Sequence, residues 1–240
     1  MLGQAGSCLL LGLLVVFSGQ PVPDRHTILW ALSVGLGSAT GTSCLYAALA
    51  SGAMALAAPV SAIITAALPV LASAILEGTP TPLHVAGFVI AAAAIWLLSR
   101  GDTDLGHRGL GLALLAGLGF GWSLVSMHLA GLTQTVWPLF LARASGTTIL
   151  LTLCLLRRVP LLQGGKLRAL AISTGLFDTM GNGLFTIATR LGRLDVMGSL
   201  ASLYPASTLL LARIVYGERT RPIQRVGLGL AAVAVLILTQ

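Results

Sequence analysis

Asp178 and Asn182 are the residues whose types and spacing first suggest chemistry in this sequence. Both lie in the apolar run 169–189, in which Asp178 is the only charged residue. Because they are four residues apart, they share one face if this run is a helix. A carboxylate in apolar surroundings can bind a cationic group of a substrate or exchange a proton with it, because burial disfavours its charged form.

A second charge offers a structural explanation for the same carboxylate. Arg143 lies in the apolar run 136–156, at a depth comparable with that of Asp178. A buried ion pair between the two side chains would hold two helices together without touching any substrate. The sequence leaves both interpretations open.

Other polar residues at similar depth extend the candidate site. Three of them are spaced four residues apart in the run 28–50, which places them on one face of a helix. The full set of candidate substrate-binding residues is Ser38, Thr42, Tyr46, Trp122, Ser126, Arg143, Asp178, Asn182 and Tyr204. We interpret two further charges, Asp195 and Arg213, differently: they lie near the ends of the run 194–216 and are expected to reach the membrane interface.

The elements that must position these side chains are membrane-spanning helices. Of the 240 residues, 56% are hydrophobic and only 9% are charged, whereas about 25% are charged in soluble domains. The net charge of +7 comes from basic residues in the connections, as in membrane proteins, and no nucleic acid is expected as a partner. Nine apolar runs are predicted as transmembrane helices: 2–18, 28–50, 53–76, 83–99, 109–131, 136–156, 169–189, 194–216 and 223–238.

The sequence lacks the residues that enzyme chemistry requires. It contains neither HExxH nor GxSxG, and no phosphate-binding glycine loop followed by lysine. Cys8, Cys44 and Cys154 fall inside apolar runs, without the spacing of metal ligands. We therefore expect no enzymatic activity, no cofactor and no metal site.

An internal repeat organises the chain. A shift of 140 positions, without gaps, pairs Gly6 with Gly146, Gly41 with Gly181, Ala48 with Ala188, Gly52 with Gly192, Pro82 with Pro222 and Gly87 with Gly227. Under this shift four helices of the first half correspond to the last four, and the run 109–131 has no partner. A five-helix repeat crosses the membrane an odd number of times, so its two copies have opposite orientations. We predict a first repeat of four helices over residues 1–99 and an inverted second repeat of five helices over residues 109–240.

The same shift relates two polar stripes. It places Ser38, Thr42 and Tyr46 at the positions of Asp178, Asn182 and Thr186. Matched polar stripes on symmetry-related helices are what a cavity on a pseudo-two-fold axis would produce. A hydrogen-bonded packing stripe would give the same pattern.

Residues of the second half also resemble a known family. The stretch 175–238, with S-L-Y-P at 202–205 and Gly217, Glu218, Arg219 and Gln224 in the following connection, resembles the C-terminal half of an EamA-like domain of the drug/metabolite transporter superfamily. The first half is a weaker copy. The resemblance implies ten helices in two inverted five-helix repeats around a central cavity, with small metabolites or drugs as cargo. Compared with that family, this chain lacks the first helix, and we expect ~30–35 coding residues with one more helix upstream of Met1.

Together these observations predict a secondary transporter in the cytoplasmic membrane. We expect a multi-pass protein of the lipid bilayer that exports or exchanges a small-molecule substrate by alternating access, with proton coupling as one option. The alternative is a truncated, inactive or partner-dependent membrane subunit without transport of its own, which the missing helix favours. The repeat symmetry favours the carrier.

Overall fold

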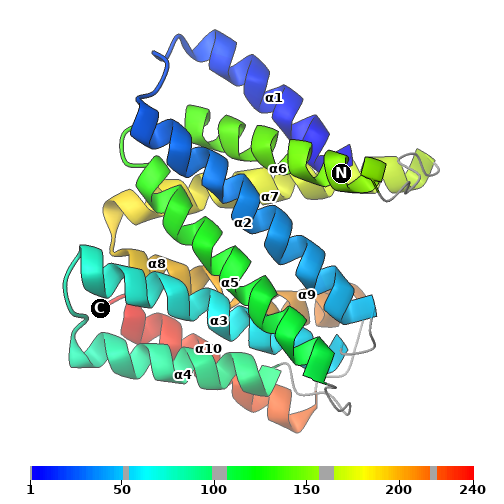
Figure 1. The fold of residues 1–240 in the computed structure, drawn as a ribbon. Helices are drawn as coiled ribbons and strands as arrows, with labels where there is room; N and C mark the ends of the chain where they lie inside the picture. Colours follow the sequence, from blue (N-terminus) through cyan, green and yellow to red (C-terminus); the bar gives the residue numbers. More distant parts are fainter. Residues whose placement is uncertain (1, 51–53, 99–106, 157–164, 217–220) are drawn as a thin grey trace. The chain divides into compact units, whose positions relative to one another are not determined.

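A computed structural model describes residues 2–50, 54–98, 107–156, 165–216 and 221–240, and these parts contain helices and no strand. The helical segments follow one another along the chain (Figure 1): α1 (Leu2–Ser18), α2 (Arg25–Ala50), α3 (Met54–Leu76), α4 (Pro82–Leu98), α5 (His107–Ala130), α6 (Val136–Leu156), α7 (Gly165–Leu191), α8 (Leu194–Ala201), α9 (Tyr204–Tyr216) and α10 (Pro222–Leu238). The prediction of an all-helical chain is therefore confirmed for these residues.

Several of these helices have the length and composition of membrane spans. Within the described residues, four are long and apolar enough to cross a bilayer: Arg25–Ala50, Ala57–Leu76, Gly109–Ala130 and Val136–Leu156. Gly3–Ser18, Pro82–Leu98 and Pro222–Leu238 are apolar but shorter. The helices thus belong to a membrane protein, while the number of crossings stays a prediction.

The run 194–216 differs from the single helix that the sequence predicts. It forms α8 and α9, with a turn at Ser202 and Leu203 between them (Figure 1). Pro205 has no N–H group to donate to the carbonyl of Ala201, so one bond of a continuous helix is missing. Ser202 N–H still donates to Gly198 O, four residues back as in a helix, whereas Leu203 N–H donates to Leu200 O, only three residues back.

The chain forms two compact units. Unit 1 contains Met1–Ala39 and Ser123–Leu191, and unit 2 contains Thr40–Trp122 and Gly192–Gln240. Each unit takes helices from both halves of the sequence. The predicted repeat boundaries, 1–99 and 109–240, describe a sequence relation between the halves and stay predictions.

The helix bounds follow the 140-residue shift closely. The shift moves α2 from 25–50 to 165–190, against 165–191 for α7, and it moves α3 from 54–76 to 194–216, the span of α8 and α9 together. It moves α4 from 82–98 to 222–238, which are the bounds of α10. Local structure therefore repeats with the same period as the sequence.

Within unit 2, α4 and α10 pack through reciprocal contacts. A Cβ atom added to Gly87 would lie 2.7 Å from Leu238 Cδ2, and one added to Gly227 would lie 3.0 Å from Leu98 Cγ. Gly227 and Leu238 are the shifted equivalents of Gly87 and Leu98. The contact between a glycine of one helix and a leucine of the other therefore occurs twice, with the two helices exchanged. Such reciprocity is typical of a two-fold relation, and the start of α4 meeting the end of α10 makes this pair antiparallel.

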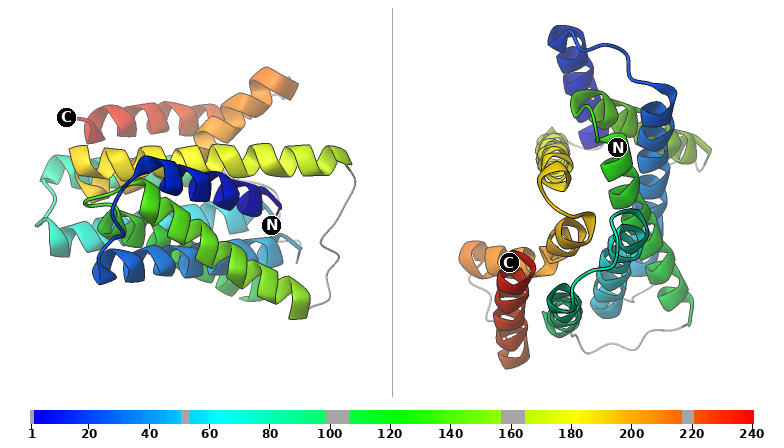
Figure 2. Two further views of the ribbon diagram at one scale, coloured as in Figure 1. Left: turned by 90° about the horizontal axis from the view of Figure 1, so that it is seen from above. Right: turned by 90° about the vertical axis from the view of Figure 1, so that its left-hand side faces the viewer.

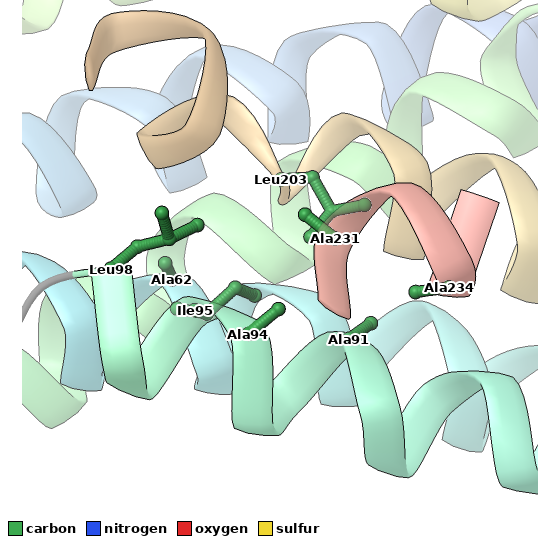
Figure 3. Close-up of a cluster of buried hydrophobic side chains, with 8 residues drawn as sticks. All are labelled: Ala62, Ala91, Ala94, Ile95, Leu98, Leu203, Ala231 and Ala234. Carbon is green, nitrogen blue, oxygen red and sulfur yellow. The ribbon is translucent and has the colours of Figure 1, made fainter. Parts of the chain in front are cut away.

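A small-residue core fills the space around this helix pair. Alanines of α4 and α10 pack with Ile95, Leu98 and Leu203, and Ala62 of α3 joins them (Figure 3). The alanines of the two helices are themselves related by the shift, Ala91 to Ala231 and Ala94 to Ala234. Small side chains allow close approach of helix backbones, which is the usual basis of helix packing in membranes.

Unit 1 shows the equivalent pattern at Gly35 and Gly175. A Cβ atom at Gly35 of α2 would meet Ala142 O of α6 at 2.7 Å, and one at Gly175 of α7 would meet Gly3 Cα of α1 at 2.7 Å. Gly175 is the shifted equivalent of Gly35. The α2–α6 and α7–α1 contacts are therefore the same close glycine contact in the two halves.

We expect Gly35→Ala to destabilise the protein. The added methyl group would overlap Ser145 Oγ and the backbone nitrogen of Gly146, and it would disturb the hydrogen bond from Ser145 Oγ to Leu32 O, 3.1 Å. Overpacking of this kind costs about 1–3 kcal/mol. Thermal unfolding of the detergent-solubilised protein should show a lower midpoint.

Gly181→Ala is the matched control for this change. No described atom outside the backbone of α7 and the residues next to Gly181 lies within 4 Å of a Cβ atom at Gly181, and alanine is the better helix former. Its unfolding midpoint should equal or exceed that of the wild type. Equal midpoints for the two variants would contradict the close α2–α6 contact.

Candidate substrate site

An ion pair joins α6 and α7 inside unit 1. Arg143 Nη1 lies 2.6 Å from Asp178 Oδ2. Asp178 is the middle residue of α7, a continuous helix of 27 residues (Figure 2). The sequence left pairing and isolation of this carboxylate open, and the structure shows pairing.

The two charges of the pair differ in exposure. The side chain of Arg143 is 9% exposed, whereas that of Asp178 is 56% exposed. A buried guanidinium depends on its counter-charge much more than an exposed carboxylate does. The pair therefore presents its carboxylate outward, where another molecule can reach it, and keeps its cation inside.

Asn182 completes the hydrogen bonding of Asp178. Its Nδ2 group donates to Asp178 O at 2.8 Å and to Asp178 Oδ1 at 3.3 Å. Both carboxylate oxygens are therefore engaged, Oδ1 by the amide and Oδ2 by Arg143. This arrangement follows from the four-residue spacing in the sequence, which places the two side chains on one face of α7.

The structure brings Arg143, Asp178 and Asn182 together through the ion pair and the hydrogen bonds of Asn182. Unit 1 also holds Ser38, whose hydroxyl donates to Gly35 O at 3.2 Å, and the buried Ser126. Unit 2 holds the rest of the set, Thr42, Tyr46, Trp122 and Tyr204. Tyr46 and Trp122 are exposed large side chains, as is Tyr204.

Two residues near Arg143 were missed by the sequence analysis. Gln4 on α1 and Thr147 on α6 each bury a side-chain oxygen that has no hydrogen-bond partner in the described structure. The spacing of Thr147, one turn after Arg143, could have indicated it. Nothing in the sequence pairs Gln4 with Arg143, because they lie on helices far apart in the chain.

A second charged cluster lies in unit 2, at the start of α8. Arg193 Nη2 lies 2.9 Å from Asp195 Oδ2, and Asp195 is fully buried. The prediction that Asp195 reaches the membrane interface is therefore wrong. Its carboxylate instead accepts from the Val196 N–H at 2.8 Å and from Arg193. The side chain of Arg213, which was given the same interpretation, lies outside the described residues.

The same cluster ties α8 to the end of α3. Arg193 Nη2 also donates to Gly78 O at 2.9 Å and to Ser73 Oγ at 3.3 Å. The Leu194 N–H donates to Glu77 Oε2 at 3.0 Å, so the carboxylate of the residue that directly follows α3 caps the N-terminus of α8. This placement is favourable because the N-terminus of a helix carries partial positive charge.

Two charged groups in the connections have shifted pKa values. The hydrogen bond with Asp195 raises the pKa of Arg193, so this guanidinium stays charged. The hydrogen bond with the Thr27 side chain lowers the pKa of Asp24, the residue before α2. Asp24 therefore keeps the negative charge that suits the start of a helix.

Comparison with known proteins identifies the family. Residues 107–240, from the start of α5 to the end of the chain, match the model of the EamA-like transporter family. A solved structure titled "Crystal structure of protein" is similar in fold, with a TM-score of 0.66 and 19% identity over 98% of this chain and 94% of that one. None of the curated proteins matches this sequence. Because the family match spans more than half of the chain, the protein belongs to the EamA-like transporter family.

Proposed function

We propose that this protein is a secondary carrier that moves a small metabolite or drug across the cytoplasmic membrane by alternating access. Membership of a family of small-molecule transporters supports the general function. The sequence contains no nucleotide-binding loop, so an ion gradient or solute exchange supplies the energy. The inverted-repeat sequence pattern is the one found in many such carriers.

The observation that carries this proposal is the ion pair between Arg143 and Asp178. Charges within membrane helices are costly, about 2.5–3.5 kcal/mol each on insertion scales, and they usually mark a transport pathway. Here the cation is buried and the carboxylate is exposed. We assign Arg143, Asp178 and Asn182 to the substrate site, and Asp178 is the group that would take up a proton if transport is proton-coupled.

The other candidate residues keep a supporting role in this proposal. Polar or aromatic side chains along the pathway would contact the cargo on its way, and Ser38, Thr42, Tyr46, Trp122, Ser126 and Tyr204 are of that kind. Tyr46 and Trp122 have exposed side chains that can serve as walls. Each would modulate the rate, whereas the ion pair decides whether transport occurs.

A transport screen with the purified protein tests the proposal. Proteoliposomes containing the full chain are incubated with a mixed panel of carboxylates, amines, amino acids and nucleosides, and the solutes inside are measured by mass spectrometry. We expect at least one solute to enter faster than in protein-free liposomes. The same flux should fall by at least about tenfold, or 1.4 kcal/mol of barrier, in Arg143→Gln/Asp178→Asn.

The double variant is chosen because it removes both charges and leaves no uncompensated ion. Its folding is checked by its elution as a single species in size-exclusion chromatography. If no solute enters faster than in protein-free liposomes, the carrier proposal fails and a non-transporting membrane subunit becomes the better description.

A further inference from the structure

In the part of the chain that the structure describes, three buried polar atoms without a hydrogen-bond partner lie in the α1 and α6 helices of unit 1. They are Arg143 Nη2, Gln4 Oε1 and Thr147 Oγ1. An unpaired polar atom in a protein interior destabilises the folded state, and an unpaired charged group does so more strongly. Three such atoms on two adjacent helices would gain hydrogen bonds from a further polar molecule.

Contacts between the helices place the residues that carry these atoms on facing sides of α1 and α6. Gln4 Oε1 lies 3.5 Å from the Cβ position of Gly146, which is three residues from Arg143 and directly precedes Thr147. The Gln4 face of α1 therefore lies against the Arg143 face of α6.

The charges restrict which molecule can bind there. Arg143 is nine-tenths buried and has one counter-charge among the described residues, Asp178. A cationic ligand on Asp178 would take away that counter-charge and leave a buried cation uncompensated, which is strongly unfavourable. An anionic ligand has the opposite effect, because it supplies a new counter-charge to Arg143. Asp178 can then leave the ion pair at little cost, because its carboxylate is already more than half exposed.

The unpaired atoms match an oxyanion. Arg143 Nη2 offers N–H donors, and Thr147 Oγ1, one helical turn away, offers an O–H donor. Charge-assisted hydrogen bonds from a guanidinium to a carboxylate are about twice as strong as neutral ones. Gln4 Oε1 is an acceptor, so it suits an N–H or O–H group beside the oxyanion.

We propose that Arg143 and Thr147 form a carboxylate-binding subsite, and that the cargo of this protein carries a carboxylate group. The proposal rests on the proposed function and narrows its substrate class. It also replaces the idea that Asp178 recognises a cationic substrate by itself, because the buried Arg143 makes such binding unfavourable.

Three probes with the same carbon chain test this subsite. They are 3-methylbutanoate, which is a carboxylate, 3-methylbutanamide, which is neutral, and isopentylamine, which is a cation. Each is added at millimolar concentration to the full chain in lipid nanodiscs, and thermal unfolding is measured. A ligand that binds only the folded state raises the midpoint, so we expect a rise with the carboxylate and none with the amide or the amine.

Two neighbouring threonines provide matched variants. Thr147→Val removes the proposed donor with little change in shape. It should raise the carboxylate concentration needed for the same shift of the unfolding midpoint by about tenfold, because one hydrogen bond to a charged group is lost. Thr148→Val is the control, because the Thr148 hydroxyl already donates to Ala144 O at 2.8 Å and is exposed. It should leave the response to the carboxylate unchanged.

The outcomes separate this subsite from the carrier proposal. A larger shift with the amine, no shift with any probe, or equal responses of the two threonine variants would overturn the subsite. If an amine or a neutral solute is transported and the carboxylate probe does not change the unfolding midpoint, the carrier proposal holds and the carboxylate subsite is rejected. A carboxylate shift lost in Thr147→Val, but without flux of any solute, would support the subsite and reject the carrier.

Discussion

Replacing Arg193 by alanine should strongly reduce the stability of the protein. The change removes the counter-charge of Asp195, which is fully buried. It also removes the hydrogen bonds to Gly78 O and Ser73 Oγ that tie α8 to the end of α3. Removing one partner of a buried pair costs about 3–5 kcal/mol, which is a large part of the stability of a typical domain. Membrane accumulation and the thermal unfolding midpoint should both fall.

The double variant Arg193→Ala/Asp195→Asn distinguishes charge from packing. An asparagine can still accept from the Val196 N–H and carries no charge, so accumulation should recover in part. Arg25→Ala is the control, because Arg25 is an exposed arginine at the start of α2. If Arg193→Ala accumulates as well as Arg25→Ala, the Arg193–Asp195 pair does not stabilise α8.

The elements of the fold that could be predicted are those set by local composition. Uncharged apolar runs are long enough to show where helices lie, and the 140-residue repeat anticipates that α4 and α10 have equivalent bounds. The division of the run 194–216 into α8 and α9 was missed because proline is tolerated inside membrane helices. Pro59 and Pro69 lie within the continuous α3, whereas Pro205 follows a turn. Whether a proline bends or ends a helix depends on the surrounding packing.

The candidate site was predictable only in part. The pairing of Asp178 with Asn182 follows from helical spacing, and Arg143 was the natural partner because charges are scarce at that depth. The prediction for Asp195 was wrong because a charge near the end of an apolar run is expected to reach the membrane interface. The partner of Asp195 is Arg193, which lies just before the helix, and the sequence does not show that the two side chains pair. Gln4 and Thr147 could not be recognised, because an unpaired buried oxygen is a property of tertiary packing.

Asp178→Asn should lower the amount of protein in the membrane. Asparagine keeps the shape of the side chain and can hydrogen-bond with Asn182, but it leaves Arg143, 9% exposed, without a counter-charge. The expected cost is about 3–5 kcal/mol. Asp24→Asn is the matched control: Asp24 is exposed at the start of α2, and asparagine caps helices as well as aspartate does. Quantitative immunoblotting of membranes should show a loss for Asp178→Asn alone.

The Arg143→Gln/Asp178→Asn double variant then separates stability from function. With both charges removed, no buried ion is left uncompensated, so accumulation should return towards that of the wild type. Transport should not return, because the proposed carboxylate subsite and its counter-charge are both lost. Flux per molecule of reconstituted protein, measured with the cargo found in the screen, should stay at least about tenfold below wild type.

Each other result of this comparison assigns the pair a different role. Normal accumulation of Asp178→Asn with at least about tenfold lower flux would show that Asp178 acts on the substrate or a proton and contributes little to folding. Recovery of both accumulation and flux in the double variant would make the pair a structural link between α6 and α7. Normal accumulation and normal flux of Asp178→Asn would reject both roles. The search for the site would then move to the exposed side chains of Tyr46 and Trp122 in unit 2.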